Sequence, residues 1–193
     1  MGHVHFNLNN SGSLHTLASP QVGVSGTLPP NMQGANQGGL YLIVNTQVNG
    51  VNRYVGKTGN IEDRFNGRML TINEFGLAQA QLQGTWAFWG QATVWNTAAP
   101  NAPAVQGGAP NYGANQVMAT IDGVQVNLEA LLIRCVRQIV AGVNNATMTN
   151  LQYMNNTFSN TTGNNLTIQI DTCQGGVYNA WQGQHTIPAN GQL

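Results

Sequence analysis

Charged side chains are the scarcest feature of this chain. Only 6% of its 193 residues are Asp, Glu, Lys or Arg, against about 25% in an average soluble domain. Neutral residues such as Asn, Gln, Gly, Ser and Thr supply the polarity instead, and six basic and six acidic side chains give a net charge of zero. Proteins that hold nucleic acid by phosphate neutralisation alone carry a basic surplus. The composition therefore speaks against that mode of binding for this chain by itself.

Long apolar runs and cysteine motifs are missing too. No stretch approaches the roughly 18 to 20 apolar residues of a membrane span. The first ten residues have neither the basic start nor the apolar run of a secretory signal. From these absences we expect no membrane association, and a location in the cytoplasm or export by a non-classical route. Cys135 and Cys173 have no further Cys or His at ligand spacing and form no metal motif.

The few charges are gathered at two places. One group lies between residues 53 and 74, the other lies between residues 122 and 137, and Asp171 stands alone. Because neutral amides already keep the surface polar, charge confined to two loci predicts a site that needs it. The two groups comprise Arg53, Lys57, Glu62, Asp63, Arg64, Arg68 and Glu74, and then Asp122, Glu129, Arg134 and Arg137.

The chain divides by composition into three parts. Residues 1–38 are rich in Gly, Pro, Ser and Asn and predict an irregular N-terminal extension with one weak strand signal, Val4 to Leu8. Residues 39–145 form the predicted main domain, interrupted by a low-complexity loop at 98–115, and residues 146–193 are an amide-rich C-terminal extension. The pair His3 and His5 could hold a metal, although such pairs near chain ends are usually polar surface.

The strongest local pattern is a β-hairpin followed by a helix. Leu40 to Val44 reads as a strand, Asn49-Gly50 suits a tight turn because both positions tolerate positive φ, and Val51 to Val55 returns as the second strand. Asn60 is a plausible N-cap for a helix from Ile61 to about Leu70.

Further elements follow along the chain. Asn127 can cap the best helical pattern in the sequence, whose apolar positions recur on one face. The remaining expected elements are a helix at Asn73–Gln83, a strand at Trp86–Trp95, the capped helix from Leu128 to about Gly142, and a strand at Leu166–Asp171.

Two triplets in the hairpin carry a family resemblance. Gly39-Leu40-Tyr41 and Tyr54-Val55-Gly56 lie on its two strands, Lys57 follows directly, Arg64 lies on the next predicted helix, and Glu129 opens the later one. This pattern resembles the GIY-YIG nucleases, including the nuclease module of the bacterial excision-repair subunit, over about residues 39 to 145. The resemblance implies an α+β fold: a small sandwich with a central three-stranded, mostly antiparallel sheet flanked by helices, plus the two extensions.

The resemblance also implies catalytic roles. It makes Tyr41 the general base, Arg64 the phosphate ligand and Glu129 the ligand of one Mg²⁺ or Mn²⁺ ion, and Tyr54, Lys57 and Arg68 complete the expected catalytic group. These residue types suit the chemistry, because one carboxylate can hold a hard cation that keeps several waters, and a guanidinium is a planar fork for phosphate. Free tyrosine ionises near pH 10, so its basic role requires nearby cations that lower its pKa.

Other residues are candidates for contact with nucleic acid. Arg68 stands where many family members carry His or Tyr, and an arginine binds phosphate but shuttles protons poorly because it stays charged. Arg53, Lys57 and Arg68 are the expected phosphate contacts, and Asn144 or the neighbouring Asn145 is the candidate for the asparagine that often closes the family's site.

The expected function is metal-dependent cleavage of DNA, or of RNA, by an endonuclease. The low charge requires either one local basic face or a tethering domain or partner protein that delivers the substrate, and the smooth amide surface would suit an exported toxin. Two alternatives stay open: a catalytically inactive nucleic-acid-binding or structural module on the same scaffold, and a carbohydrate-binding or adhesive protein that uses exposed tryptophans.

Overall fold

The computed structural model describes eight segments of the chain: residues 2–13, 39–45, 52–59, 85–96, 118–141, 147–148, 159–172 and 183–192. Their regular elements are, in chain order, β1 (Gly2–Ser13), β2 (Gly39–Asn45), β3 (Asn52–Thr58), β4 (Thr85–Trp95), β5 (Met118–Ile121), β6 (Val124–Asn127), α4 (Leu128–Ala141), β7 (Thr147–Met148), β8 (Leu166–Thr172) and β9 (Gly183–Ile187).

One mixed sheet of seven strands organises the described residues, in the order β7-β3-β2-β4-β1-β8-β9. β2 pairs antiparallel with both β3 and β4, and β4 pairs antiparallel with β1. β1 then pairs in parallel with β8, which pairs antiparallel with β9. At the other end β7 pairs with only two residues of β3. The N-terminal strand therefore lies inside the sheet rather than beside it.

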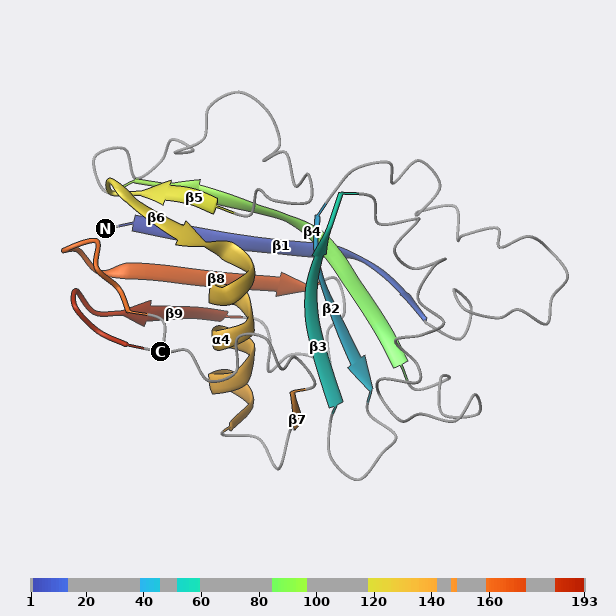
Figure 1. Cartoon of the computed structure of the whole chain (residues 1–193). Helices are drawn as coiled ribbons and strands as arrows, with labels where there is room; N and C mark the ends of the chain where they lie inside the picture. The colour runs from blue at the N-terminus through green and yellow to red at the C-terminus, as the bar shows by residue number, and fades with distance from the viewer. Residues whose placement is uncertain are drawn as a thin grey trace, which may run out of the picture.

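The sheet has two halves that run in different directions. In Figure 1, β1, β8 and β9 run across the picture, whereas β2 and β3 run nearly upright and the long, bent β4 connects them to β1. The pairing of β1 with β4 shifts register between Asn7 and Asn10, which marks a bulge. A Cβ atom on Gly90 would collide with the backbone of Asn7. Glycine is therefore required where the strands bend past each other.

Strict alternation along the strands separates two faces of the sheet. Val4, Phe6 and Leu8 on β1 are fully buried, and the residues between them point to the other face. We call the face that carries these three residues the helix face, because α4 covers it, and the opposite one the far face. By register the helix face also carries Leu40, Leu42, Val55, Lys57, Phe88, Ala92, Val94, Ile168 and Ile170.

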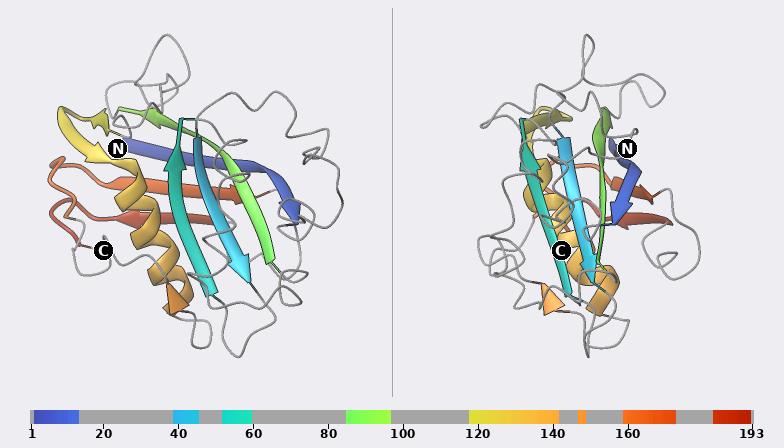
Figure 2. Two further views of the ribbon diagram at one scale, coloured as in Figure 1. Left: turned by 45° about the vertical axis from the view of Figure 1, so that its right-hand side comes forward. Right: turned by 90° about the vertical axis from the view of Figure 1, so that its right-hand side faces the viewer.

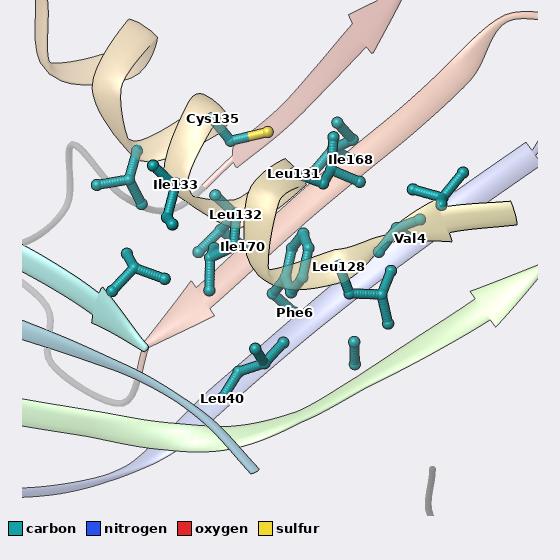
Figure 3. Close-up of a cluster of buried hydrophobic side chains, with 14 of the residues drawn as sticks. Val4, Phe6, Leu40, Leu128, Leu131, Leu132, Ile133, Cys135, Ile168 and Ile170 are labelled. Carbon is teal, nitrogen blue, oxygen red and sulfur yellow. The ribbon is translucent and has the colours of Figure 1, made fainter. Parts of the chain in front are cut away.

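Helix α4 seals the helix face with its apolar side. Leu128, Leu131 and Leu132 are at most 1% exposed and belong to one buried cluster with the strand residues. Figure 3 shows these leucines beside Phe6 and Leu40, and the views of Figure 2 place α4 on one side of the sheet, running alongside β3. Fully burying one such side chain contributes about 1.5–3 kcal/mol, so this layer is the main source of cohesion.

The hairpin of β5 and β6 leads directly into α4. Asp122 and Gly123 form the two-residue turn between β5 and β6, and both have positive φ, at 47° and 84°. That combination is the turn type favoured in hairpins. β6 runs directly into α4, where the Asn127 Oδ1 accepts a hydrogen bond of 3.0 Å from the Ala130 N–H. The predicted cap and the predicted helix are confirmed, with α4 ending at Ala141.

The predicted fold class is wrong. A three-stranded sheet flanked by helices was expected, but the sheet has seven strands and α4 is the single helix among the described segments. The pattern at Val4 to Leu8 looked weak because polar residues surround it, yet it belongs to the twelve-residue strand β1. Its pairing with β8 joins opposite ends of the chain, a contact that local periodicity does not reveal.

The local strand predictions agree with the structure. The strands expected at Leu40–Val44, Trp86–Trp95 and Leu166–Asp171 lie within β2, β4 and β8. β3 covers the described part of the strand predicted at Val51–Val55 and continues to Thr58, and Val51 itself lies outside the described residues. The Asn49-Gly50 turn, the helices at Ile61–Leu70 and Asn73–Gln83 and the loop at 98–115 lie outside the described residues.

Candidate functional site

The hairpin of β2 and β3 carries both triplets in one register. Tyr41 lies opposite Gly56, Ile43 lies opposite Tyr54, and Leu40 lies opposite Lys57. Directly opposed residues of an antiparallel pair share a face. Lys57 therefore emerges on the helix face, whereas Tyr41 and Tyr54 emerge on the far face.

Lys57 and Glu129 come together on the helix face. The Lys57 Nζ lies 3.9 Å from the Glu129 Oε2, and their side chains are 26% and 12% exposed. Glu129 occupies the first turn of α4, where the helix dipole favours negative charge. Because the capped start of α4 meets the end of β3, the chain brings a cation and a carboxylate from two distant segments to one half-buried spot.

The two tyrosines form a separate aromatic pair on the far face. Their ring centroids are 6.0 Å apart with an interplanar angle of 22°. A Cβ atom on Gly56 would collide with the Tyr41 ring and hydroxyl, so the phenol lies across this glycine. Tyr41 is fully buried and Tyr54 is partly exposed. The thickness of the sheet separates this pair from Lys57 and Glu129.

The structure therefore assembles part of the predicted site. It joins Lys57 to Glu129 and stacks Tyr41 on Tyr54, but it puts the two pairs on opposite faces. Arg64, Arg68 and Asn144 lie outside the described residues. The backbone of Arg53 pairs with Val44 of β2 and with Met148 of β7.

Sequence reasoning noted the pair His3 and His5 but missed the cluster that they form with Asp171 and Trp95 on the far face. The His5 Nε2 lies 2.7 Å from the Asp171 Oδ2, and the Gln169 Nε2 donates to the same carboxylate oxygen at 2.9 Å. The centroid of the Trp95 indole lies 4.9 Å from that of the His3 ring and 6.4 Å from that of the His5 ring. We call His3, His5, Trp95 and Asp171 the histidine cluster. Its signals in the sequence were the His3-x-His5 spacing and the isolated Asp171.

Burial changes the acid–base behaviour of two groups in the described segments. Desolvation, and secondarily the charge of His5, lowers the pKa of His3 below its ordinary value. Burial also raises the pKa of the Cys135 thiol, which is a free cysteine inside the core. A buried thiol held in its protonated form is a poor nucleophile, so Cys135 is a packing residue.

No group of three or more His, Cys, Asp or Glu side chains in the described segments forms a ready-made metal cage. None of their helices has the length and apolar character needed to cross a membrane.

Comparison with known proteins adds no relative. No protein-family profile, no curated protein and no solved structure matches this chain.

Proposed function

We propose that this chain is a divalent-metal-dependent nuclease that hydrolyses phosphodiester bonds of DNA, with its reaction centre where Lys57 meets Glu129. The observation that carries the proposal is the 3.9 Å separation between the Lys57 Nζ and the Glu129 Oε2. Both residues were candidates from the resemblance to GIY-YIG nucleases, and they come from segments far apart in the chain. A carboxylate can hold a metal ion, and a neighbouring cation can stabilise charge on a phosphate.

Glu129 is the proposed holder of the metal ion. The proposed site offers the metal ion one protein carboxylate, with Lys57 close to it. Such a site fits Mg²⁺ or Mn²⁺ when the ion keeps several waters and takes its remaining ligands from the substrate phosphate. When bound, the ion neutralises charge that develops on the phosphate and acidifies a bound water. In this proposal Lys57 leaves the carboxylate and binds a non-bridging phosphate oxygen as substrate arrives.

The proposal assigns no proton transfer to Tyr41. That phenol is fully buried on the far face, so it does not share a surface with Glu129. The scarcity of cations in the chain also shapes the proposal. Because few phosphates can be neutralised, binding by this chain alone is weak. A tethered domain or partner protein that delivers the DNA, with Arg53, Arg64 and Arg68 as extra phosphate contacts, completes the proposal.

The separation of Tyr41 from Glu129 favours a second candidate. A non-catalytic module that binds nucleic acid needs no shared pocket for the phenol and the carboxylate. For a sugar-binding surface, the Trp89 side chain is only 3% exposed and cannot serve as a stacking platform, whereas Trp95 is partly exposed.

A plasmid-nicking assay tests the proposal. Purified protein is incubated with supercoiled plasmid and Mg²⁺ or Mn²⁺, and Glu129→Gln is compared with the wild type because it keeps the shape of the side chain. We expect the variant to nick at least about 100-fold more slowly, a typical loss when one electrostatic catalytic group is removed. Asp122→Asn is the matched control, since it makes the same chemical change in the β5–β6 turn, where Asn tolerates positive φ.

The outcomes of this assay are distinct. Nicking that requires the metal ion, is lost in Glu129→Gln and is kept in Asp122→Asn supports the nuclease. DNA binding without cleavage by the wild type favours the second candidate. Equal nicking by the wild type and Glu129→Gln refutes the assignment of this carboxylate.

A further inference from the structure

The histidine cluster brings two imidazoles to one side of β1. His3 and His5 are two positions apart on the strand, so both side chains point to the far face. Their ring centroids are 6.5 Å apart. Trp95 lies opposite His3 in the register of β1 and β4, and its indole lies near both rings, with centroid distances of 4.9 Å to His3 and 6.4 Å to His5. The two imidazole rings therefore lie next to each other and next to the Trp95 indole.

Asp171 fixes the orientation of one of these rings. The carboxylate only accepts hydrogen bonds, so His5 donates to it from Nε2 over 2.7 Å. The neutral ring then carries a lone pair on Nδ1. An imidazole whose outer nitrogen donates to a carboxylate is the usual arrangement of a histidine that binds a metal ion. Gln169 donates to the same Asp171 oxygen and holds the carboxylate in place.

The second ring has a polar atom with nothing to bind. The His3 Nε2 is buried and has no hydrogen-bond partner. A buried polar atom that is left unsatisfied destabilises the folded state. A ligand that draws this ring toward His5 would remove that destabilisation, so the ligand-free arrangement favours binding.

We propose that His3 and His5 bind one divalent transition-metal ion, of the class of Zn²⁺, Cu²⁺ or Ni²⁺, with Asp171 as the positioning residue for His5. Imidazole ligands select these ions over Mg²⁺ or Ca²⁺. Metal–nitrogen bonds of about 2.0–2.1 Å require the two ring centres to approach by roughly 1 Å, so rotation of the His3 side chain accompanies binding. Water molecules complete the coordination.

This site is independent of the proposed nuclease centre. Lys57 and Glu129 lie on the helix face, and the histidine cluster lies on the far face of the other half of the sheet. The two sites also take different ions, because one carboxylate with water suits Mg²⁺ and paired imidazoles suit softer metals.

Titration of the untagged wild-type protein with Cu²⁺ tests the inference. Trp95 is adjacent to both rings, so its fluorescence should be quenched as Cu²⁺ binds, with a stoichiometry near one. Calorimetric titration with Zn²⁺ gives an independent affinity. We expect His3→Gln and His5→Gln each to weaken binding at least about tenfold, and Asp171→Asn to weaken it about 10- to 100-fold without changing the stoichiometry.

His185→Gln is the matched control. His185 lies opposite Ile168 on β9, so it points to the helix face, and its replacement should leave the affinity within about twofold. Trp95→Phe should remove the fluorescence change and keep the calorimetric binding. Thermal melting of each variant checks that it is folded. Failure of the wild type to bind either ion saturably, or equal affinities for the wild type and both folded variants, His3→Gln and His5→Gln, overturns the proposal.

Discussion

The two halves of the sheet differ in how far apart their partners lie along the chain. β2 and β3 are consecutive strands of a hairpin, whereas β1 pairs in parallel with β8 across almost the whole sequence. The hydrogen bond between His5 and Asp171 joins residues 166 positions apart. Each half also carries its own polar cluster: Lys57 with Glu129 on the helix face, and the histidine cluster on the far face. The hairpin of β2 and β3 is therefore one part of a wider sheet, and the other half of that sheet carries a second candidate site.

The largest expected effect is on stability, and it tests whether β1 contributes to the core of the fold. Phe6→Ala removes a fully buried ring from the cluster beneath α4. We expect it to lower the free energy of unfolding by about 3–5 kcal/mol, as large core truncations do. Asn7→Ala, at the exposed neighbouring position, is expected to change it by no more than about 0.5 kcal/mol. Urea unfolding measures both, and equal small effects would mean that β1 is peripheral.

Substitutions at two glycines compare the place where β4 crosses the bulge of β1 with the hairpin of β2 and β3. Gly90→Ala drives a Cβ atom into the backbone of Asn7, whereas Gly56→Ala drives one into the side chain of Tyr41. Since a backbone yields less than a side chain, Gly90→Ala should cost about 3 kcal/mol or more and Gly56→Ala about 1–3 kcal/mol. Denaturant unfolding ranks the two. Tyr41→Phe should relieve part of the Gly56→Ala cost and leave the Gly90→Ala cost unchanged.

The smallest expected effect concerns pH and the far face. Because the pKa of His3 is lowered on folding, the unfolded chain takes up a proton more readily than the folded chain. The contribution of His3 to stability is therefore complete above its ordinary pKa of 6.5 and is lost as the pH falls through the lowered value. The melting temperature of the wild type should fall more between about pH 7.5 and pH 5 than that of His3→Gln. If the melting temperatures of the two proteins depend on pH in the same way, His3 does not contribute to the pH dependence of stability.

Local rules predicted individual strands and the start of α4, but they did not predict the fold class. Alternating or β-branched runs gave the strands at Leu40–Val44, Trp86–Trp95 and Leu166–Asp171, and the Asn127 cap gave the start of α4. These features depend on neighbours in the sequence, so a short window contains their cause. The position of β1 and its parallel partner β8 depend on contacts between chain ends, which no window contains.

The candidate site was predictable to a similar extent. Lys57 and Glu129 were chosen from sequence motifs, and the structure brings them together. The face on which Tyr41 lies depends on strand register, which pairs it with Gly56 and moves it away from Glu129. A shift of one residue would reverse every side chain, so spacing along the chain did not fix this outcome. The histidine cluster could not be predicted in full, because Asp171 and its partner His5 lie 166 positions apart in the sequence.

A double-mutant cycle on nicking rates tests the central claim most directly. Single-turnover rates in Mg²⁺ are measured for the wild type, Lys57→Ala, Glu129→Ala and the double variant. If the two residues act in one reaction centre, each single change slows cleavage and the double variant is within about threefold of Glu129→Ala alone, because groups that act as a unit are not additive. Independent multiplication of the two losses, or a wild-type rate for either single variant, would contradict a shared centre at Lys57 and Glu129.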